Sequence, residues 1–163
     1  MFLLCADKFA IMAATRSGHT NMYHYFGIWP YDATGYTLEN WKEHHNPIVV
    51  LRNPLDRLIS SLHISNVIPK SQLYLHSQPY MHTLDCDFRI IDFYDLEQYI
   101  PRSKLMQSPR SDSRADDSAV ADDVYVPNDV YLLDDLREEL KIYRDLMKTK
   151  ERVSVEEWKE LTT

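Results

Sequence analysis

Two short apolar runs, each followed at once by a polar turn and then by a helical pattern, constrain the fold of this chain more than any other feature. The first run is residues 9–14 (FAIMAA), and the turn at residues 15–20 (TRSGHT) follows it directly. The second is residues 48–51 (IVVL), which ends at Arg52. Short uncharged runs of this kind are typical of strands buried on both faces of a parallel sheet. The pattern predicts an α/β protein with three layers and a mainly parallel central sheet.

The remaining predicted elements alternate around these two strands. A third strand is expected over residues 88–94 because its residues are β-branched and aromatic. Thr37, Asn53, Asn128 and Ser154 are good helix N-caps, and Ser154 opens a capping-box pattern. The predicted helices cover residues 21–26, 37–43, 54–65, 71–84 with an interruption near Pro79, a long segment starting at Asn128, and a last short segment around Trp158.

Length and composition favour one globular domain. A chain of 163 residues has the usual size of a single domain, so we expect residues 1–163 to form one. Residues 108–123, rich in serine and aspartate, predict a flexible acidic loop, and residues 128–161 predict C-terminal helices. Two cysteines are too few for a disulfide framework or a four-thiolate zinc site, and we expect no metal. Since the chain has no long apolar span or basic leader, we expect a cytoplasmic protein that does not bind membranes.

The negative charge is confined to one part of the chain. The formal net charge is −7, and residues 1–110 contain ten basic and ten acidic residues, so the whole excess lies in residues 111–163. An acidic total argues against nucleic acid as a partner, because such proteins normally present a basic face. A local site for a small anion in the first two-thirds of the chain is compatible with this distribution.

The first turn has the composition of an anion site. A turn that joins a buried strand to a helix directs backbone N–H groups and the positive helix end at one point. Arg16 adds a charged donor fork, and Ser17, Thr20 and Asn21 add neutral donors. The pattern is not the nucleoside-triphosphatase loop, because the G-x-x-x-x-G-K-[ST] sequence is absent. An ordinary strand–helix turn with a solvated arginine is the alternative interpretation.

The second motif is residues 52–61 (RNPLDRLISS). Arg52 ends a predicted strand, which is where open α/β sheets bind ligands, and Ser60 follows eight residues later on the predicted helix. Both side chains could bind one phosphate, the arginine in a bidentate manner. Alternatively, Arg52 and Asp56 form a capping ion pair and Ser60 is a small helix residue.

Taken together, the two motifs resemble those of the sulfotransferases that use 3′-phosphoadenylyl sulfate, in particular the carbohydrate-type and short microbial or viral members. The resemblance implies a P-loop-like fold, 3′-phosphoadenylyl sulfate as cosubstrate, adenosine 3′,5′-bisphosphate as product, and a hydroxyl or amine acceptor, with carbohydrates among the candidates. It implies that Arg52 and Ser60 bind the 3′-phosphate and that Arg16 stabilises the leaving oxygen. It further implies that the 5′-phosphosulfate is bound by Arg16, Ser17, Gly18, His19, Thr20 and Asn21.

The general base is not specified by any motif. His44 and His45 are candidates because they precede the second strand and family members often use a histidine, although Pro47 suggests that they enter that strand from the wrong end. His19 and Glu39 are further candidates. The chain departs from the family at Thr15, where a proline is usual, and it lacks the late R-K-G segment of the cytosolic members.

Two other functions stay open. The first is a non-catalytic nucleotide- or anion-binding module whose acidic helical tail binds a partner. The second, weaker alternative is a nucleotide or small-molecule kinase, against which stands the missing Walker lysine. The sequence identifies neither the acceptor nor the oligomeric state.

Overall fold

The structure, a computed structural model, describes residues 1–28, 36–63, 78–101 and 133–163. It divides into two compact units. The sheet unit comprises Met1–Leu51, Cys86–Arg110 and Lys150–Thr163, and the helical unit comprises Arg52–Asp85 and Ser111–Thr149. The predicted flexible loop at residues 108–123 and the predicted cap at Asn128 lie outside the described residues.

A mixed sheet forms the centre of the sheet unit. Its strands lie in the order β1-β2-β3-β4, and β2, β3 and β4 are parallel while β1 pairs antiparallel with β2. This arrangement confirms an α/β fold with a mainly parallel sheet. The antiparallel strand β1 was not predicted from the sequence. The strands are β1 (Phe2–Cys5), β2 (Ala10–Ala13), β3 (Pro47–Leu51) and β4 (Arg89–Asp92).

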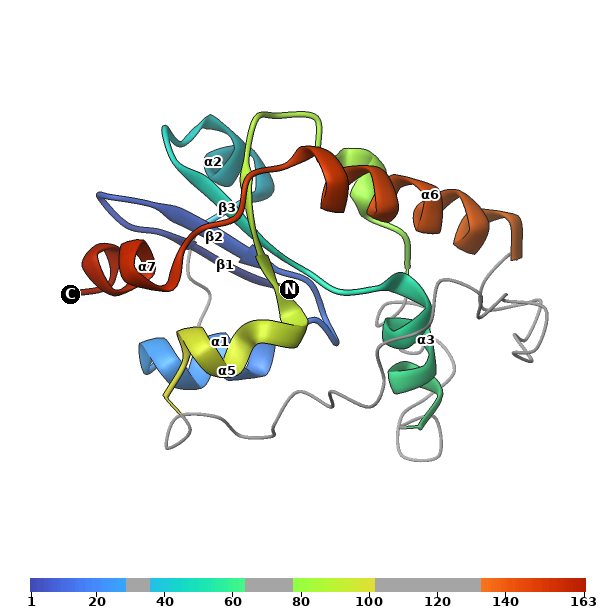
Figure 1. Ribbon diagram of the computed structural model, residues 1–163, viewed down its shortest axis with the longest axis horizontal. Helices are drawn as coiled ribbons and strands as arrows, with labels where there is room; N and C mark the ends of the chain where they lie inside the picture. Colours follow the sequence, from blue (N-terminus) through green and yellow to red (C-terminus); the bar gives the residue numbers. More distant parts are fainter. Residues whose placement is uncertain (29–35, 64–77, 102–132) are drawn as a thin grey trace. The chain divides into compact units, whose positions relative to one another are not determined.

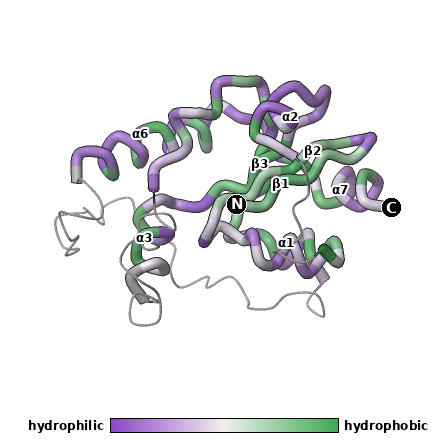
Figure 2. Tube along the Cα trace, turned by 180° about the vertical axis from the view of Figure 1, so that it is seen from behind, coloured by the Kyte–Doolittle hydropathy of each residue, from purple (hydrophilic) through white to green (hydrophobic). Residues whose placement is uncertain are grey.

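The outer side of β4 is paired with the chain segment that precedes the last helix. Ile90 donates its N–H to the carbonyl of Glu151 at 2.9 Å, and Val153 donates to the carbonyl of Ile90 at 2.9 Å. Figure 2 shows that the labelled strands of the sheet consist mostly of hydrophobic residues. A sheet that is covered on both faces has hydrophobic residues on both sides of its strands, so these strands do not alternate between hydrophobic and polar residues as a half-exposed sheet does.

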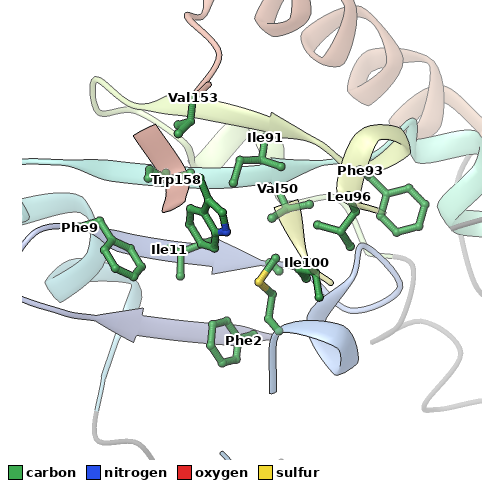
Figure 3. Close-up of a cluster of buried hydrophobic side chains, with 13 residues drawn as sticks. Phe2, Phe9, Ile11, Val50, Ile91, Phe93, Leu96, Ile100, Val153 and Trp158 are labelled. Carbon is green, nitrogen blue, oxygen red and sulfur yellow. The ribbon is translucent and has the colours of Figure 1, made fainter. Parts of the chain in front are cut away.

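Helices cover both faces of this sheet. Figure 1 shows α1 (His19–Phe26) and α5 (Leu96–Tyr99) on one side and α2 (Leu38–Glu43) on the other. On the α2 side, the fully buried Trp41 donates its indole N–H to the carbonyl of Ile48 at 3.0 Å. On the opposite side, Figure 3 shows the buried cluster that α1, α5 and α7 (Val155–Leu161) share with the sheet: Phe2, Phe9, Ile11, Ala13, Met22, Ile48, Val50, Ile91, Phe93, Leu96, Ile100, Val153 and Trp158.

The predicted helix caps in this unit are confirmed. The Thr37 side chain accepts the N–H of Asn40, and the Asn40 side chain accepts the N–H of Thr37, so the two residues form a reciprocal capping box. Ser154 likewise accepts the N–H of Glu157 at 3.1 Å at the start of α7. These bonds satisfy donors that a helix cannot satisfy itself, which is why the sequence defines both helix starts so well.

The helical unit contains α3 (Pro54–His63), the 3₁₀ turn η1 (Met81–Thr83) and α6 (Leu133–Thr149). The predicted helix over residues 71–84 was given an interruption near Pro79, and residues 78–80 are indeed irregular, but residues 81–83 after the interruption form the 3₁₀ turn η1 instead of an α-helix. Pro79 has no N–H to donate and disfavours a helical conformation for Gln78. Among the described residues no helix has both the length and the apolar character needed to cross a bilayer.

A bidentate ion pair attaches α7 to the sheet. The Arg89 guanidinium donates to both carboxylate oxygens of Glu157 at 2.6 and 2.7 Å, and also to the Asn46 side chain at 2.9 Å. The hydrogen bonds from Arg89 hold the pKa of the Glu157 carboxyl below its usual range. Glu157 therefore stabilises the folded state above the carboxyl's unfolded pKa, and this contribution is lost as the pH falls through its lower folded pKa.

We predict that Glu157→Gln lowers the free energy of unfolding at pH 7 by about 0.5–1 kcal/mol, a small value because both side chains are partly exposed. The difference from the unsubstituted protein should begin to shrink as the pH falls below the unfolded carboxyl pKa of about 4.3, and it should disappear below the lower folded pKa. Urea unfolding between pH 3 and pH 7 measures both effects. The matched control is Glu138→Gln, which removes a solvent-exposed pair with Lys141 at 3.9 Å and should change stability by much less at every pH. A pH-independent effect of Glu157→Gln would contradict the prediction.

Candidate functional site

The first turn connects β2 to α1 at the carboxyl end of β2 and has an unusual backbone. Ser17 donates its N–H to the carbonyl of Ala14 at 2.9 Å, which closes the turn. Arg16 has a φ of 64°, the left-handed region that residues with a Cβ rarely adopt. Gly18 has a φ of 91° and is the N-cap residue of α1. Strained backbone of this kind concentrates at binding and catalytic sites, so this turn is a candidate site on its geometry as well as its composition.

Ser17 provides the second unusual feature of this turn. Its side chain is completely buried, and its hydroxyl has no hydrogen-bond partner among the described residues. A buried hydroxyl without a partner is costly, so such a group often marks a place where a ligand or an ion completes the structure. Its neighbour Asn21 is also largely buried, whereas Thr20 is exposed and Arg16 and His19 are partly exposed. The turn thus offers buried and accessible donors within one short segment.

The turn packs on the segment that follows β4. A Cβ added to Gly18 would lie 3.1 Å from the Leu96 side chain and 3.6 Å from that of Phe93, and both of these residues are buried. Since β2, β3 and β4 are parallel, the segments after β2 and after β4 lie at the same edge of the sheet, where α/β proteins bind ligands. The side chains of Phe93 and Leu96 therefore pack against the turn at Gly18, a contact that the sequence did not indicate.

We predict that Gly18→Ala destabilises the protein by about 2–3 kcal/mol, of which about 1–2 kcal/mol comes from the left-handed backbone and the rest from contact with Leu96. The matched control is Gly27→Ala, because Gly27 also has a left-handed φ, 69°, but no atom within 4 Å of an added Cβ. Gly27→Ala should cost only the backbone part, about 1 kcal/mol. Thermal or urea unfolding of both variants gives the difference, and equal losses would show that the contact with Leu96 has no energetic effect.

The second motif begins at Arg52, the residue after the end of β3, and continues into α3 of the helical unit. The Asn53 side chain accepts the N–H of Leu55 at 2.9 Å, which confirms the predicted cap of this helix. Arg52 is only 7% exposed, and Ser60 is partly buried two turns farther along α3. Ser61, fully buried, donates to the carbonyl of Arg57 at 3.0 Å and is part of the helix packing. Arg52 and Ser60 thus both belong to the helical unit.

The helical unit also contains a buried carboxylate that the sequence analysis did not identify. Glu139 on α6 is 2% exposed, and it accepts the N–H of Tyr80 at 3.2 Å. Burial raises the pKa of this carboxyl, while bonds from the backbone of Tyr80 and Met81 and the charge of Arg57 oppose the shift. A sequence signal was present, since Glu139 is three residues after Leu136 and next to Leu140, within the apolar stripe of α6.

The structure does not bring the histidines expected as bases to the first turn. His44 and His45 precede β3, so they lie at its amino end, at the edge of the sheet opposite to that turn. Asn46 donates its N–H to His44 Nδ1 at 3.0 Å, and His44 Nε2 lies 2.7 Å from the carbonyl oxygen of Ala6. Because Nδ1 accepts, Nε2 carries the proton and donates. His44 is used in a structural turn on which His45 stacks, with ring centroids 4.3 Å apart.

The two other candidate bases are placed differently. His19 is the first residue of α1 and therefore lies in the first turn, partly exposed, with its ring 6.3 Å from that of Tyr23. Glu39 is exposed and is the second residue of α2. Of the four residues considered as a base, His19 is thus the one that belongs to the first turn.

Comparison with known proteins gives no relative. No family model, no curated protein and no solved structure matches the chain.

Proposed function

We propose that the protein is a sulfotransferase-like protein of P-loop-like fold that binds 3′-phosphoadenylyl sulfate and transfers its sulfuryl group to a hydroxyl or amine acceptor. The observation that carries the proposal is the first turn. It combines a left-handed arginine, a buried serine hydroxyl without a partner among the described residues, and the amino end of α1 at the ligand-binding edge of a parallel sheet. All three features suit an anionic group.

Each motif has a distinct part in this proposal. Arg16, Ser17, Gly18, His19, Thr20 and Asn21 would bind the 5′-phosphosulfate, and Arg52 and Ser60 would bind the 3′-phosphate. The acceptor oxygen or nitrogen attacks sulfur and gives up its proton to a general base, for which His19 is the candidate in the first turn, and the bond between sulfur and the bridging oxygen breaks. The electron pair stays on that oxygen, which becomes part of the 5′-phosphate of adenosine 3′,5′-bisphosphate. Arg16 and the helix end would neutralise the charge that develops there, as in other group transfers dominated by electrostatics.

Thermal unfolding with product tests the cosubstrate site. At one hundred times its dissociation constant, adenosine 3′,5′-bisphosphate should stabilise the protein by about 2.7 kcal/mol, a rise of roughly 5–10 °C in the midpoint. ADP at the same concentration should give a much smaller rise because it lacks the 3′-phosphate. Arg52→Ala should remove most of the rise with the bisphosphate. If millimolar bisphosphate shifts neither protein, the proposal is wrong.

A second candidate function follows from the positions of the histidines. Since His44 and His45 lie at the other edge of the sheet, a nucleotide-binding module without catalysis is favoured if His19 does not serve as the base. Both functions predict bisphosphate binding, so the thermal shift does not separate them. Release or transfer of labelled sulfate from 3′-phosphoadenylyl sulfate separates the two functions. Turnover that His19→Ala abolishes, with bisphosphate binding intact, supports the enzyme, and stable binding of the cosubstrate without turnover supports the module.

A further inference from the structure

Two buried charged side chains of the helical unit bind the same short segment. Arg57 on α3 is 3% exposed, and its guanidinium donates to the carbonyl of Gln78 at 2.7 Å and lies 4.9 Å from the centre of the Tyr80 ring. Glu139 on α6 accepts the backbone N–H of Tyr80 at 3.2 Å. The Arg57 guanidinium therefore contacts a carbonyl oxygen and an aromatic face, while the Glu139 carboxylate accepts a hydrogen bond from the backbone.

These contacts connect three parts of the chain that are distant in sequence. Arg57, the segment 78–81 and Glu139 come from α3, the approach to η1, and α6, and α6 packs against both α3 and η1. In the helical unit, Figure 1 shows η1 alongside α6. A buried charge is tolerated when a partner of opposite charge and hydrogen bonds compensate it, and removing one partner leaves the other uncompensated. Arg57 and Glu139 are thus energetically coupled through the segment they share.

Arg57 also belongs to the first turn of α3. It donates its backbone N–H to the carbonyl of Asn53 at 3.0 Å, and its own carbonyl accepts the hydroxyl of Ser61. The Arg57 side chain therefore anchors a residue of α3 that lies between Arg52 and Ser60 in the sequence and is hydrogen-bonded to Asn53 and Ser61. Neither Arg57 nor Glu139 has enough exposed surface to contact a ligand itself.

We propose that Glu139 is a positioning residue for the second motif. Through Arg57 and the segment 78–81 it holds the first turn of α3 in the conformation from which Arg52 and Ser60 bind a 3′-phosphate. This inference rests on the proposed function and deepens it, because it assigns to α6 a part in recognising one of the two phosphates of the nucleotide.

The test compares two nucleotides that each have one phosphate. The dissociation constants of 3′-AMP and 5′-AMP are measured by calorimetry on the full chain and on the variant Glu139→Gln. The variant should bind 3′-AMP about 3- to 30-fold more weakly, and its affinity for 5′-AMP should be unchanged. Arg57→Gln should have the same effect, and the double variant should be no weaker than the worse single one, since both residues act through one segment.

Controls separate positioning from loss of folding. Glu138→Gln changes the exposed neighbouring glutamate of the same helix and should leave both affinities unchanged. Thermal unfolding verifies that each variant is folded. If Glu139→Gln does not fold, Glu139→Asp, which keeps the charge on a shorter side chain, takes its place and should show the same selective loss.

The outcomes distinguish the inference from the proposed function. If a folded Glu139 variant keeps its affinity for 3′-AMP, or loses affinity for both nucleotides equally, the positioning role is wrong while the proposed function stands. If the unsubstituted protein binds 3′-AMP with no dependence on Arg52, the proposed function is wrong and the inference fails with it.

Discussion

Replacing Trp158 by alanine is expected to lower the free energy of unfolding by about 3–5 kcal/mol, and the thermal midpoint by roughly 6–20 °C. The indole is fully buried in the cluster beneath the sheet, where its ring centre lies 5.5 Å from that of Phe9 and 6.2 Å from that of Phe26. Its N–H donates to the carbonyl of Tyr99 at 3.1 Å. One side chain of α7 thus packs against the residues before β2, against α1 and against α5, so its removal leaves a large cavity.

Two further variants isolate the causes of this loss. Trp158→Phe leaves the Tyr99 carbonyl without its indole donor, as Trp158→Ala does, but it keeps part of the ring contacts. It should therefore lower the free energy of unfolding by less than Trp158→Ala. Tyr36→Ala removes an aromatic ring that is 39% exposed and should change stability by less than about 0.5 kcal/mol. Calorimetric or urea unfolding measures all three variants. A loss for Trp158→Ala as small as that for Tyr36→Ala would contradict the described core.

The second large effect concerns the two phosphates of the nucleotide. If the first turn binds the 5′-phosphate and the second motif the 3′-phosphate, Arg16→Ala should weaken 5′-AMP binding by about 10- to 100-fold and leave 3′-AMP unaffected. Arg52→Ala should do the reverse, because a charge-assisted bidentate bond to phosphate is worth about 1.5–3 kcal/mol. Calorimetric titration of both variants with both nucleotides gives four values, and the crossed pattern is the expected result.

A control for general electrostatics is available on α6. Arg137 is about half exposed, and its guanidinium lies 3.9 Å from a carboxylate oxygen of Asp134. Arg137→Ala removes the same charge at a residue that belongs to neither motif. It should change both affinities much less than Arg16→Ala or Arg52→Ala, because an exposed charge that does not contact the nucleotide is largely screened at 0.15 M salt. If Arg16→Ala and Arg52→Ala each weakened the binding of both nucleotides equally, the assignment of one phosphate to each motif would be wrong.

Much of the fold could be predicted because it depends on local patterns. The apolar runs before Arg16 and Arg52 became β2 and β3, and the capping residues Thr37, Asn53 and Ser154 all begin helices as expected. A cap needs only a polar side chain a few residues from the donor it accepts, so sequence spacing is enough to define it. The composition of the first turn was equally local, and the structure adds its left-handed backbone and the unpartnered hydroxyl.

Features that depend on distant contacts were not predicted. β1 is a strand because it pairs with β2, and an apolar run of four residues does not by itself indicate that pairing. The pairing of Glu139 with the Tyr80 turn joins residues 59 positions apart, which no local pattern can indicate. The positions of His44 and His45 follow from strand direction, and Pro47 at the start of β3 was the signal that pointed to the amino end.

Calorimetric titration of the unsubstituted protein with adenosine 3′,5′-bisphosphate and with 5′-AMP measures whether one nucleotide binds to both motifs. If both motifs bind one nucleotide, the bisphosphate should bind at least tenfold more tightly than 5′-AMP, and Arg52→Ala should reduce its affinity to that of 5′-AMP. A bisphosphate that binds no more tightly than 5′-AMP, in a protein that unfolds cooperatively, would contradict the account.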